Sequence, residues 1–311
     1  MNRNRAAVLG AACLLLAARP AVSGPPGYAF LEVPAGARAS ALGGAFASFA
    51  QDIDAAFWNP AGLDGVKGIQ VSGTHVEYMQ KLRHDQFAVA GRGFDGGIAG
   101  SVRALYSEPI EERDEVGNLL GSFGTYDLEL ALAYGRTVSP GLSLGGTAEL
   151  VRERIAEASA STYAFGLGAV WAPAMVAGLR LGLSTHNLGP AARFVFDGAP
   201  GKPVSLPAAV QAGGSWQRLL ARGAVLRAAL EGRFTRGRSG IGMLGVEVAS
   251  VGGAKGAGAA ALRGGLRMND DTAGLSLGAG YTLPGLRLDY AFVPLRLDLG
   301  DTHRISFAAQ F

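Results

Sequence analysis

Residues 125–134 read Thr-Tyr-Asp-Leu-Glu-Leu-Ala-Leu-Ala-Tyr, and their pattern recurs through most of this 311-residue chain. Large apolar side chains fall on one parity, from Tyr126 to Tyr134, while Asp127 and Glu129 fall on the other. Because successive side chains of a strand point to opposite faces, this period of two predicts a strand with one apolar and one polar face. Aromatic residues stand at both ends of the apolar face, which is typical of a membrane-spanning strand.

The same alternation recurs across residues 66–311, in segments of about ten residues that end in turn sequences such as Ser139-Pro140-Gly141. The stretch 158–179 carries no charge, but Gly166, Gly168 and Pro173 and its strict alternation favour strands over a transmembrane helix. About fourteen segments are expected. They begin near Ile69, Gln86, Gly97, Thr125, Gly141, Thr162, Gly178, Pro207, Ala224, Ile241, Gly258, Ala273, Leu286 and His303.

Two properties of these strands favour a membrane barrel over a soluble sandwich. Their polar face carries Arg, Glu, Asp and Ser, which the core of a sandwich could not bury unpaired. Tyr163 and Trp171 are eight residues apart, which at a tilt of about 40° corresponds to roughly 20 Å of membrane thickness. We therefore expect an all-β protein, a transmembrane antiparallel up-and-down barrel in contact with outer-membrane lipid, since closure leaves no unpaired strand edge in lipid.

Residues 1–23 have the features of a secretory signal peptide. Arg3 and Arg5 precede an apolar run over residues 6–18, which is too short to span a bilayer, and Ala21-Val22-Ser23 offers a cleavage site. A membrane anchor is the alternative. Cleavage as a lipoprotein at Cys13 is disfavoured, because the apolar run continues beyond that residue. Export to the outer membrane is the expected outcome.

The composition excludes several classes of protein. Apolar residues make up 49% and charged residues 17% of the chain, which excludes a disordered protein. There are 48 glycines, but they follow no Gly-X-Y period, so the chain is not collagen. The formal charge of +3 comes from Arg3, Arg5 and Arg19; without them the basic and acidic residues balance. No nucleic-acid partner is expected.

Residues 24–65 lack strand alternation. Residues 37–49 are rich in Ala and Gly, residues 51–56 can start a short helix, and Asn59-Pro60 then favours a turn. One interpretation is a mobile leader ahead of the first strand. The other is a small helical plug, or hatch, whose short side chains pack inside the barrel, and this is the domain division that we expect: 1–23, 24–65 and 66–311.

The chain ends on an alternating strand in which Ile305, Phe307 and Phe311 share one parity. A terminal aromatic residue in this setting resembles the signal read by the outer-membrane barrel-assembly machinery, which is therefore an expected partner.

Several motifs together resemble the PorV/PorQ family, whose barrels are related to the FadL transporters. The opening motifs are residues 36–46 (GARASALGGAF), Asp52 and residues 55–63 (AAFWNPAGL). The later motifs are residues 184–189 (STHNLG), 262–265 (LRGG), 288–292 (LDYAF) and 300–306 (GDTHRIS). This resemblance implies a fourteen-stranded barrel with an N-terminal plug, and it makes Asn59, Pro60, Ala61 and Gly62 the plug motif.

The resemblance implies two functions. A PorV-type protein is a non-enzymatic barrel that works through protein partners in type IX secretion and surface assembly, and this is the main expectation. The alternative is FadL-like transport of a hydrophobic ligand, which passes sideways into the bilayer when the plug moves. It is supported by four apolar candidates for the hatch: Phe46, Phe49, Phe57 and Trp58. The lumen-facing charges Arg180, Glu149 and Arg287 also permit a passive porin.

The sequence shows no pattern for an enzyme, a cofactor or a metal. The histidines His75, His84, His186 and His303 are scattered, without metal-ligand spacing. Residues 252–258 are rich in glycine but lack the Lys-Ser/Thr pair of a phosphate loop, and no Gly-x-Ser-x-Gly motif has identifiable partners. The acidic residues between 108 and 115 are expected to form a solvated loop.

Overall fold

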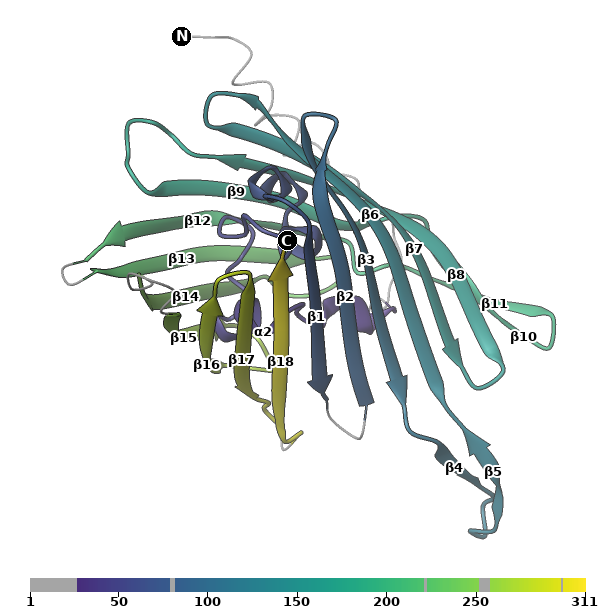
Figure 1. Cartoon of the computed structure of the whole chain (residues 1–311). Helices are drawn as coiled ribbons and strands as arrows, with labels where there is room; N and C mark the ends of the chain where they lie inside the picture. Colours follow the sequence, from purple (N-terminus) through teal and green to yellow (C-terminus); the bar gives the residue numbers. More distant parts are fainter. Residues whose placement is uncertain (1–26, 79–81, 221–222, 252–257, 298) are drawn as a thin grey trace.

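A computed structural model describes residues 27–78, 82–220, 223–251, 258–297 and 299–311 (Figure 1). The expected signal peptide and most of the glycine-rich stretch 252–258 lie outside the described residues. No helix in the described part of the chain is long and apolar enough to cross a membrane.

Fourteen antiparallel strands form a closed barrel, as the alternation predicts, and pairing of β8 with β9 completes the ring (Figure 1). The order around the barrel is β8-β7-β6-β3-β2-β1-β18-β17-β16-β15-β14-β13-β12-β9. The strands are β1 Gln70–Glu77, β2 Leu82–Gly93, β3 Gly96–Ser107, β6 Thr125–Ser139, β7 Leu142–Ile155, β8 Ala158–Trp171, β9 Leu179–Leu188, β12 Ala209–Leu219, β13 Ala224–Thr235, β14 Ile241–Ser250, β15 Ala259–Met268, β16 Leu275–Leu283, β17 Leu286–Pro294 and β18 Asp301–Gln310.

The stretch expected as a solvated acidic loop and the connection between β9 and β12 each contain a short hairpin. Strands β4 (Ile110–Arg113) and β5 (Leu119–Phe123) form a separate two-stranded sheet between β3 and β6. Strands β10 (Ala192–Phe196) and β11 (Ala199–Val204) pair with each other and reach β8 at one residue pair. Asp197 and Gly198 join β10 to β11, both with positive φ, which is the turn chemistry that favours a two-residue hairpin.

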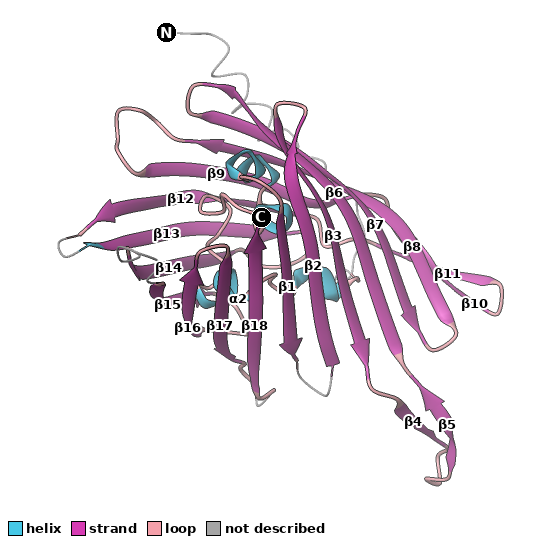
Figure 2. Cartoon of the chain, viewed as in Figure 1, coloured by secondary structure: helices cyan, strands magenta, loops and turns pink. Residues whose placement is uncertain are grey.

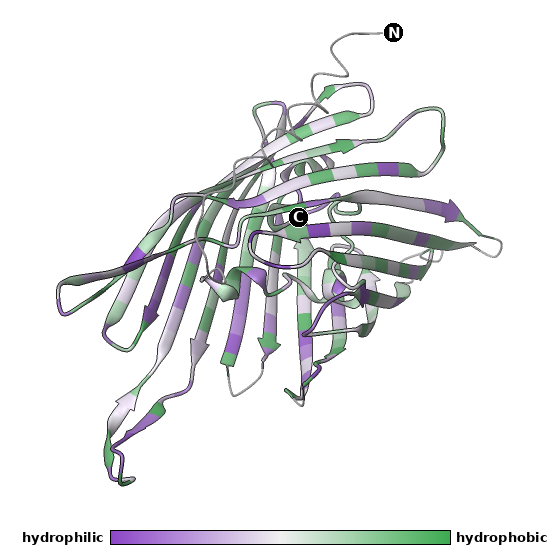
Figure 3. Ribbon diagram, turned by 180° about the vertical axis from the view of Figure 1, so that it is seen from behind, coloured by the Kyte–Doolittle hydropathy of each residue, from purple (hydrophilic) through white to green (hydrophobic). Residues whose placement is uncertain are grey.

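The two faces of the strands divide as the alternation predicts. On β7, Leu150 is 65% exposed on the outer surface whereas its neighbour Glu149 is 7% exposed inside. Figure 3 shows this alternation of apolar and polar residues along the strands. The end of the barrel with short turns at Phe94–Asp95, Pro140–Gly141 and Pro284–Gly285 is called the turn rim here, and the end with the two hairpins is called the loop rim.

Residues 27–66 fold inside the barrel rather than extending from it (Figure 2). They contain the 3₁₀ helices η1 (Ala29–Glu32) and η2 (Pro60–Gly65) and the short α-helices α2 (Ala37–Ala41) and α3 (Ala55–Trp58). The main apolar core lies between this plug and the wall, where plug side chains meet small residues of the strands. Its members include Phe46, Ile53, Trp58, Leu63, Ala88, Ala90, Ala99 and Ala133.

Candidate functional site

A row of glycines fixes η2 against one wall of the barrel. Gly97, Gly135, Gly145 and Gly168 pair directly with one another across β3, β6, β7 and β8. A Cβ atom on any of them would overlap with an atom of residues 59–63. Only glycine allows the plug backbone to lie this close to the wall. In the sequence, this glycine row consists of one glycine on the lumen face of each of the four strands. That these glycines lie at the same height can be recognised only when the register of the strands is known.

Asn59, the first residue of the predicted plug motif, is fully buried and links the plug to two strands. Its Nδ2 donates to the carbonyl oxygens of Ala47 at 2.8 Å, Ala169 on β8 at 3.1 Å and Leu183 on β9 at 3.3 Å. Its Oδ1 accepts a hydrogen bond from the Ala61 amide, which caps the start of η2. Pro60, Ala61 and Gly62 follow as the buried residues of η2.

The wall is irregular beside this junction. Between Phe165 and Leu167, β8 has one residue, Gly166, where β9 has two, so the register shifts. The Leu167 amide donates to the Thr185 side chain at 3.0 Å. A bulge of this kind locally disrupts the ladder of hydrogen bonds between the two strands.

An apolar groove of about 740 Å³ lies on the outer surface at the same height. Small residues of β7 and β8, including Gly146, Ala148 and Gly166, form part of its lining, and large apolar side chains flank them, Leu132, Phe165 and Leu167 among them. The groove therefore lies outside β6, β7 and β8, three of the four strands that carry the glycine row inside.

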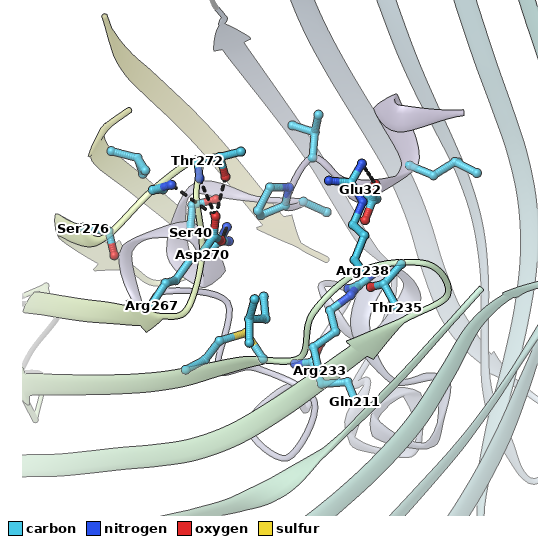
Figure 4. A pocket seen from close by; sticks show the side chains of 18 of the residues that line it. Glu32, Ser40, Gln211, Arg233, Thr235, Arg238, Arg267, Asp270, Thr272 and Ser276 are labelled. Carbon is cyan, nitrogen blue, oxygen red and sulfur yellow. Dashed lines mark hydrogen bonds and ion pairs between the residues drawn. The ribbon is translucent and has the colours of Figure 1, made fainter. Parts of the chain in front are cut away.

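A cavity of about 400 Å³ lies inside the barrel, beside the plug (Figure 4). Its apolar lining includes Leu31, Val33, Phe57, Trp58 and Met243. Its charged lining comprises Arg103, Arg233, Arg238, Arg267, Arg304, Glu32, Asp270 and Asp271. Apolar and charged side chains in one enclosed space are typical of a site for a small ligand.

The four predicted hatch residues have different positions. Phe57 and Trp58 line this cavity, and Phe49 lines a smaller cavity near the turn rim. Phe46 is fully buried in the plug, with its ring 5.3 Å from that of Phe49 and 5.9 Å from that of Trp58. The structure therefore brings two of the four side chains to the space where a ligand could lie.

Ion pairs hold the plug to the wall opposite the glycine row. Arg38 of α2 pairs with Glu247 on β14 at 3.3 Å, and Arg287 on β17 pairs with Asp52 at 2.6 Å and with Asp54. Arg263 on β15 extends the network by contacting Glu247. Burial disfavours the charged form of Asp52, but Arg287 and Arg38 outweigh it and hold the pKa of this carboxyl below its usual range.

The predicted assembly signal lies on the last strand. Ile305 and Phe307 are exposed on the outer face of β18, and Phe311 follows it, 80% exposed. The Phe311 amide donates to the carbonyl of Ile69 at 2.8 Å, and the Ile69 amide donates back at 3.2 Å. These main-chain bonds continue the pairing of β18 with β1; recognition by the assembly machinery stays a prediction.

Comparison with known proteins identifies the fold. Residues 3–150 match the sequence profile of an uncharacterised protein family, UPF0164. A search of curated protein sequences finds no significant match. The Pseudomonas putida toluene transporter TodX has 12% sequence identity and a TM-score of 0.62, with 89% of this chain and 99% of TodX covered.

Two further solved structures give the same result. The Ralstonia pickettii toluene transporter TbuX has 15% identity and a TM-score of 0.59, with 89% of this chain and 98% of TbuX covered. A FadL homologue from Pseudomonas aeruginosa has 13% identity and a TM-score of 0.51, with 88% and 98% covered. The chain thus has a fold similar to that of FadL-type outer-membrane barrels, whereas the more specific PorV/PorQ resemblance stays a prediction.

Proposed function

We propose that this chain is an outer-membrane passage for hydrophobic small molecules, with the turn rim facing the periplasm, as short turns do in barrels of this kind. The solved structures that it resembles are those of toluene transporters, a monoaromatic hydrocarbon channel and a FadL homologue. They support the transport alternative over the secretion role. The plug that fills the lumen argues against a passive porin.

One observation carries the proposal: residues 57–61 separate the inner cavity from the outer groove. Phe57 and Trp58 line the cavity, while Asn59, Pro60 and Ala61 lie on the glycine row behind the groove. A shift of this short segment would connect the two spaces at the bulge between β8 and β9. The ligand would then leave sideways, into the apolar interior of the membrane, without crossing the plug along the barrel axis.

Filling the outer groove tests the route. Ala148 is exposed on the outer face of β7 inside the groove, so Ala148→Trp would occupy the groove with an apolar side chain that lipid tolerates. Ala279, which is exposed on the outer face of β16 away from the groove, gives the matched control Ala279→Trp. Neither side chain takes part in the contacts between plug and wall.

The measurement is uptake of a neutral aromatic dye, N-phenyl-1-naphthylamine, by cells that lack the gene and carry each variant. Heat-dependent mobility on gels would verify that equal amounts of folded barrel reach the membrane. We expect Ala148→Trp to reduce uptake to the level of the empty vector and Ala279→Trp to preserve it. Equal uptake by the two variants would exclude the groove as the exit, and uptake no faster than the vector with wild-type protein would refute transport.

A further inference from the structure

The inner cavity contains more positive charge than its own acids balance. Five arginines line it, and three of them have acidic partners: Arg238 pairs with Glu32 at 2.7 Å, Arg267 with Asp270 at 3.1 Å and Arg103 with Glu129. In the described part of the chain, no acidic side chain pairs with the other two, Arg233 and Arg304.

These two arginines differ in the hydrogen bonds that they make. Arg304 is 2% exposed and its Nη1 donates only to neutral acceptors, the Pro34 carbonyl at 2.9 Å and the Ser40 hydroxyl at 2.8 Å. Its Nε has no partner. Arg233 makes no hydrogen bond or ion pair within the described residues and extends beside Gln211 and Thr235 (Figure 4).

Arg304 is buried and Arg233 is half-buried, and both guanidinium groups keep their charge, so leaving the two unbalanced is costly unless an anion is bound. Asp271 also lines the cavity, but it is exposed, and solvent screens its charge. The cavity therefore lacks about two negative charges at its polar end. Its other lining is apolar, with Leu31, Trp58 and Met243. A ligand that fits both parts has a compact dianionic head and an apolar tail.

We propose that this cavity binds an amphiphile with a phosphate monoester headgroup, held by Arg233 and Arg304 with its tail against Leu31, Trp58 and Met243. A phosphate monoester carries about −1.5 to −2 charges at neutral pH and offers three strong acceptor oxygens. Guanidinium forks bind such oxygens in pairs. A carboxylate supplies one negative charge and leaves one of the two arginines unbalanced. A neutral hydrocarbon leaves both arginines unbalanced. The inference rests on the proposed function and specifies its ligand.

Binding can be followed by the fluorescence of Trp58, which lines the cavity, in the full-length barrel in maltoside micelles. Trp171 and Trp216 are exposed on the outer surface, so Trp171→Phe and Trp216→Phe would leave Trp58 as the reporter. The probes are lysophosphatidate, a free fatty acid and a monoacylglycerol with identical tails. We expect lysophosphatidate to bind at least tenfold more tightly than either of the others.

Arg233→Gln is the decisive variant, because among the described residues the Arg233 side chain makes no hydrogen bond or ion pair whose loss would disturb the fold. Arg236→Gln, three residues further on and exposed, is the matched control for general surface charge. We expect the affinity for lysophosphatidate to fall about tenfold or more in Arg233→Gln and to stay unchanged in Arg236→Gln, while monoacylglycerol affinity is unchanged in both.

Four results would overturn the inference. Equal binding of fatty acid and lysophosphatidate would indicate a monoanion site, and equal binding of monoacylglycerol would show that charge is not recognised. An equal loss of affinity in Arg233→Gln and Arg236→Gln would indicate that overall positive charge, and not Arg233 itself, attracts the ligand. Absence of binding by all three probes would show that the cavity does not bind such an amphiphile. The dye-uptake experiment with Ala148→Trp is independent of all four results. Failure of this inference can therefore be told apart from failure of the proposed function.

Discussion

The side-chain amide of Asn59 donates to the main-chain carbonyl of Ala169 on β8 at 3.1 Å, and the same nitrogen lies 3.3 Å from the carbonyl oxygen of Leu183 on β9. A single plug residue thus bonds to both strands at the regular Ala169–Leu183 pair, two residues along β8 from Leu167, where the register shift ends. The same nitrogen also donates to the Ala47 carbonyl at 2.8 Å, which fixes Asn59 to the rest of the plug. Release of the plug at this wall therefore requires breaking these hydrogen bonds and the one that Arg180 Nε on β9 donates to the Ser48 carbonyl at 3.1 Å.

Asn59→Ala should loosen the plug without unfolding the barrel. It removes the donor shared by three main-chain carbonyl groups, and leaving a buried one such as that of Ala47 without its partner costs about 1–3 kcal/mol. We expect brief channel openings in planar bilayers, where the wild-type protein stays closed. Asn118→Ala, which removes an exposed amide of the β4–β5 hairpin, should leave the closed state unchanged. Identical conductance of the two variants would contradict the role of Asn59.

Neighbouring glycines on β7 should tolerate alanine very differently. A Cβ on Gly145 would lie 2.5 Å from the Ala61 nitrogen and the Pro60 carbonyl carbon, and these main-chain atoms cannot move aside. A Cβ on Gly146 faces outward, with nothing nearer than 3.6 Å. We expect Gly145→Ala to destabilise the plugged barrel by about 1–3 kcal/mol, as overpacking does, and Gly146→Ala to be neutral. Thermal unfolding of the two variants in detergent measures the difference.

Glu247 should be the most sensitive member of the ion-pair network. Its side chain is 1% exposed and contacts Arg263 at 2.6 Å, Arg227 at 2.5 Å and Arg38 of the plug. Glu247→Gln leaves these guanidinium groups without their shared anion, and breaking a buried pair costs about 3–5 kcal/mol. The temperature at which the folded band disappears on gels should fall clearly. Glu111→Gln, in an exposed pair with Arg113, should not change it.

The barrel was predictable because the alternation is local. Within each strand, the alternation of apolar and polar residues indicates which face contacts lipid, as Leu150 and Glu149 illustrate. Turn residues mark where the strands end. The predicted start near Gln86 lies inside β2, which begins at Leu82, because Leu82 and Arg83 extend the strand beyond the apolar stretch. The two hairpins could not be predicted, because their strands are short and β4 shows no regular alternation of apolar and polar residues.

The candidate site was predictable only in part, since it depends on register. Asn59 and the aromatic residues beside it stand out in the sequence, but the glycines that receive them are spread from Gly97 to Gly168. Their alignment exists only once four strands are paired. The unbalanced charge of Arg233 and Arg304 is equally invisible, because a lumen-facing arginine in the sequence gives no sign of whether an acid lies across from it.

Phe311 should matter for assembly in cells and not for folding in detergent. Its ring is exposed, and its contact with the first strand is made by main-chain atoms, which Phe311→Ala retains. We expect this variant to refold in micelles like the wild-type protein but to accumulate several-fold less in the outer membrane. Phe94→Ala, which removes another exposed ring at the turn rim, should accumulate normally. Equal accumulation of both variants would argue against a terminal assembly signal.

Tyr28 should make the plugged barrel sensitive to alkaline pH. Burial, with a further contribution from the negative charges of Glu153 and Asp127, raises the pKa of Tyr28 from 10.0 to about 12. Because the folded state holds the phenol proton more tightly than the unfolded state, the associated stability is present below pH 10 and is lost as the pH rises to about 12.

Tyr28→Phe has no proton to lose, so its unfolding temperature should fall less steeply over this range. At neutral pH it should match the wild-type protein, since the Tyr28 hydroxyl has no hydrogen-bond partner in the described part of the chain. Tyr126→Phe, whose ring is exposed on the outer face, controls for removal of a tyrosine, and parallel curves for all three proteins would refute the effect.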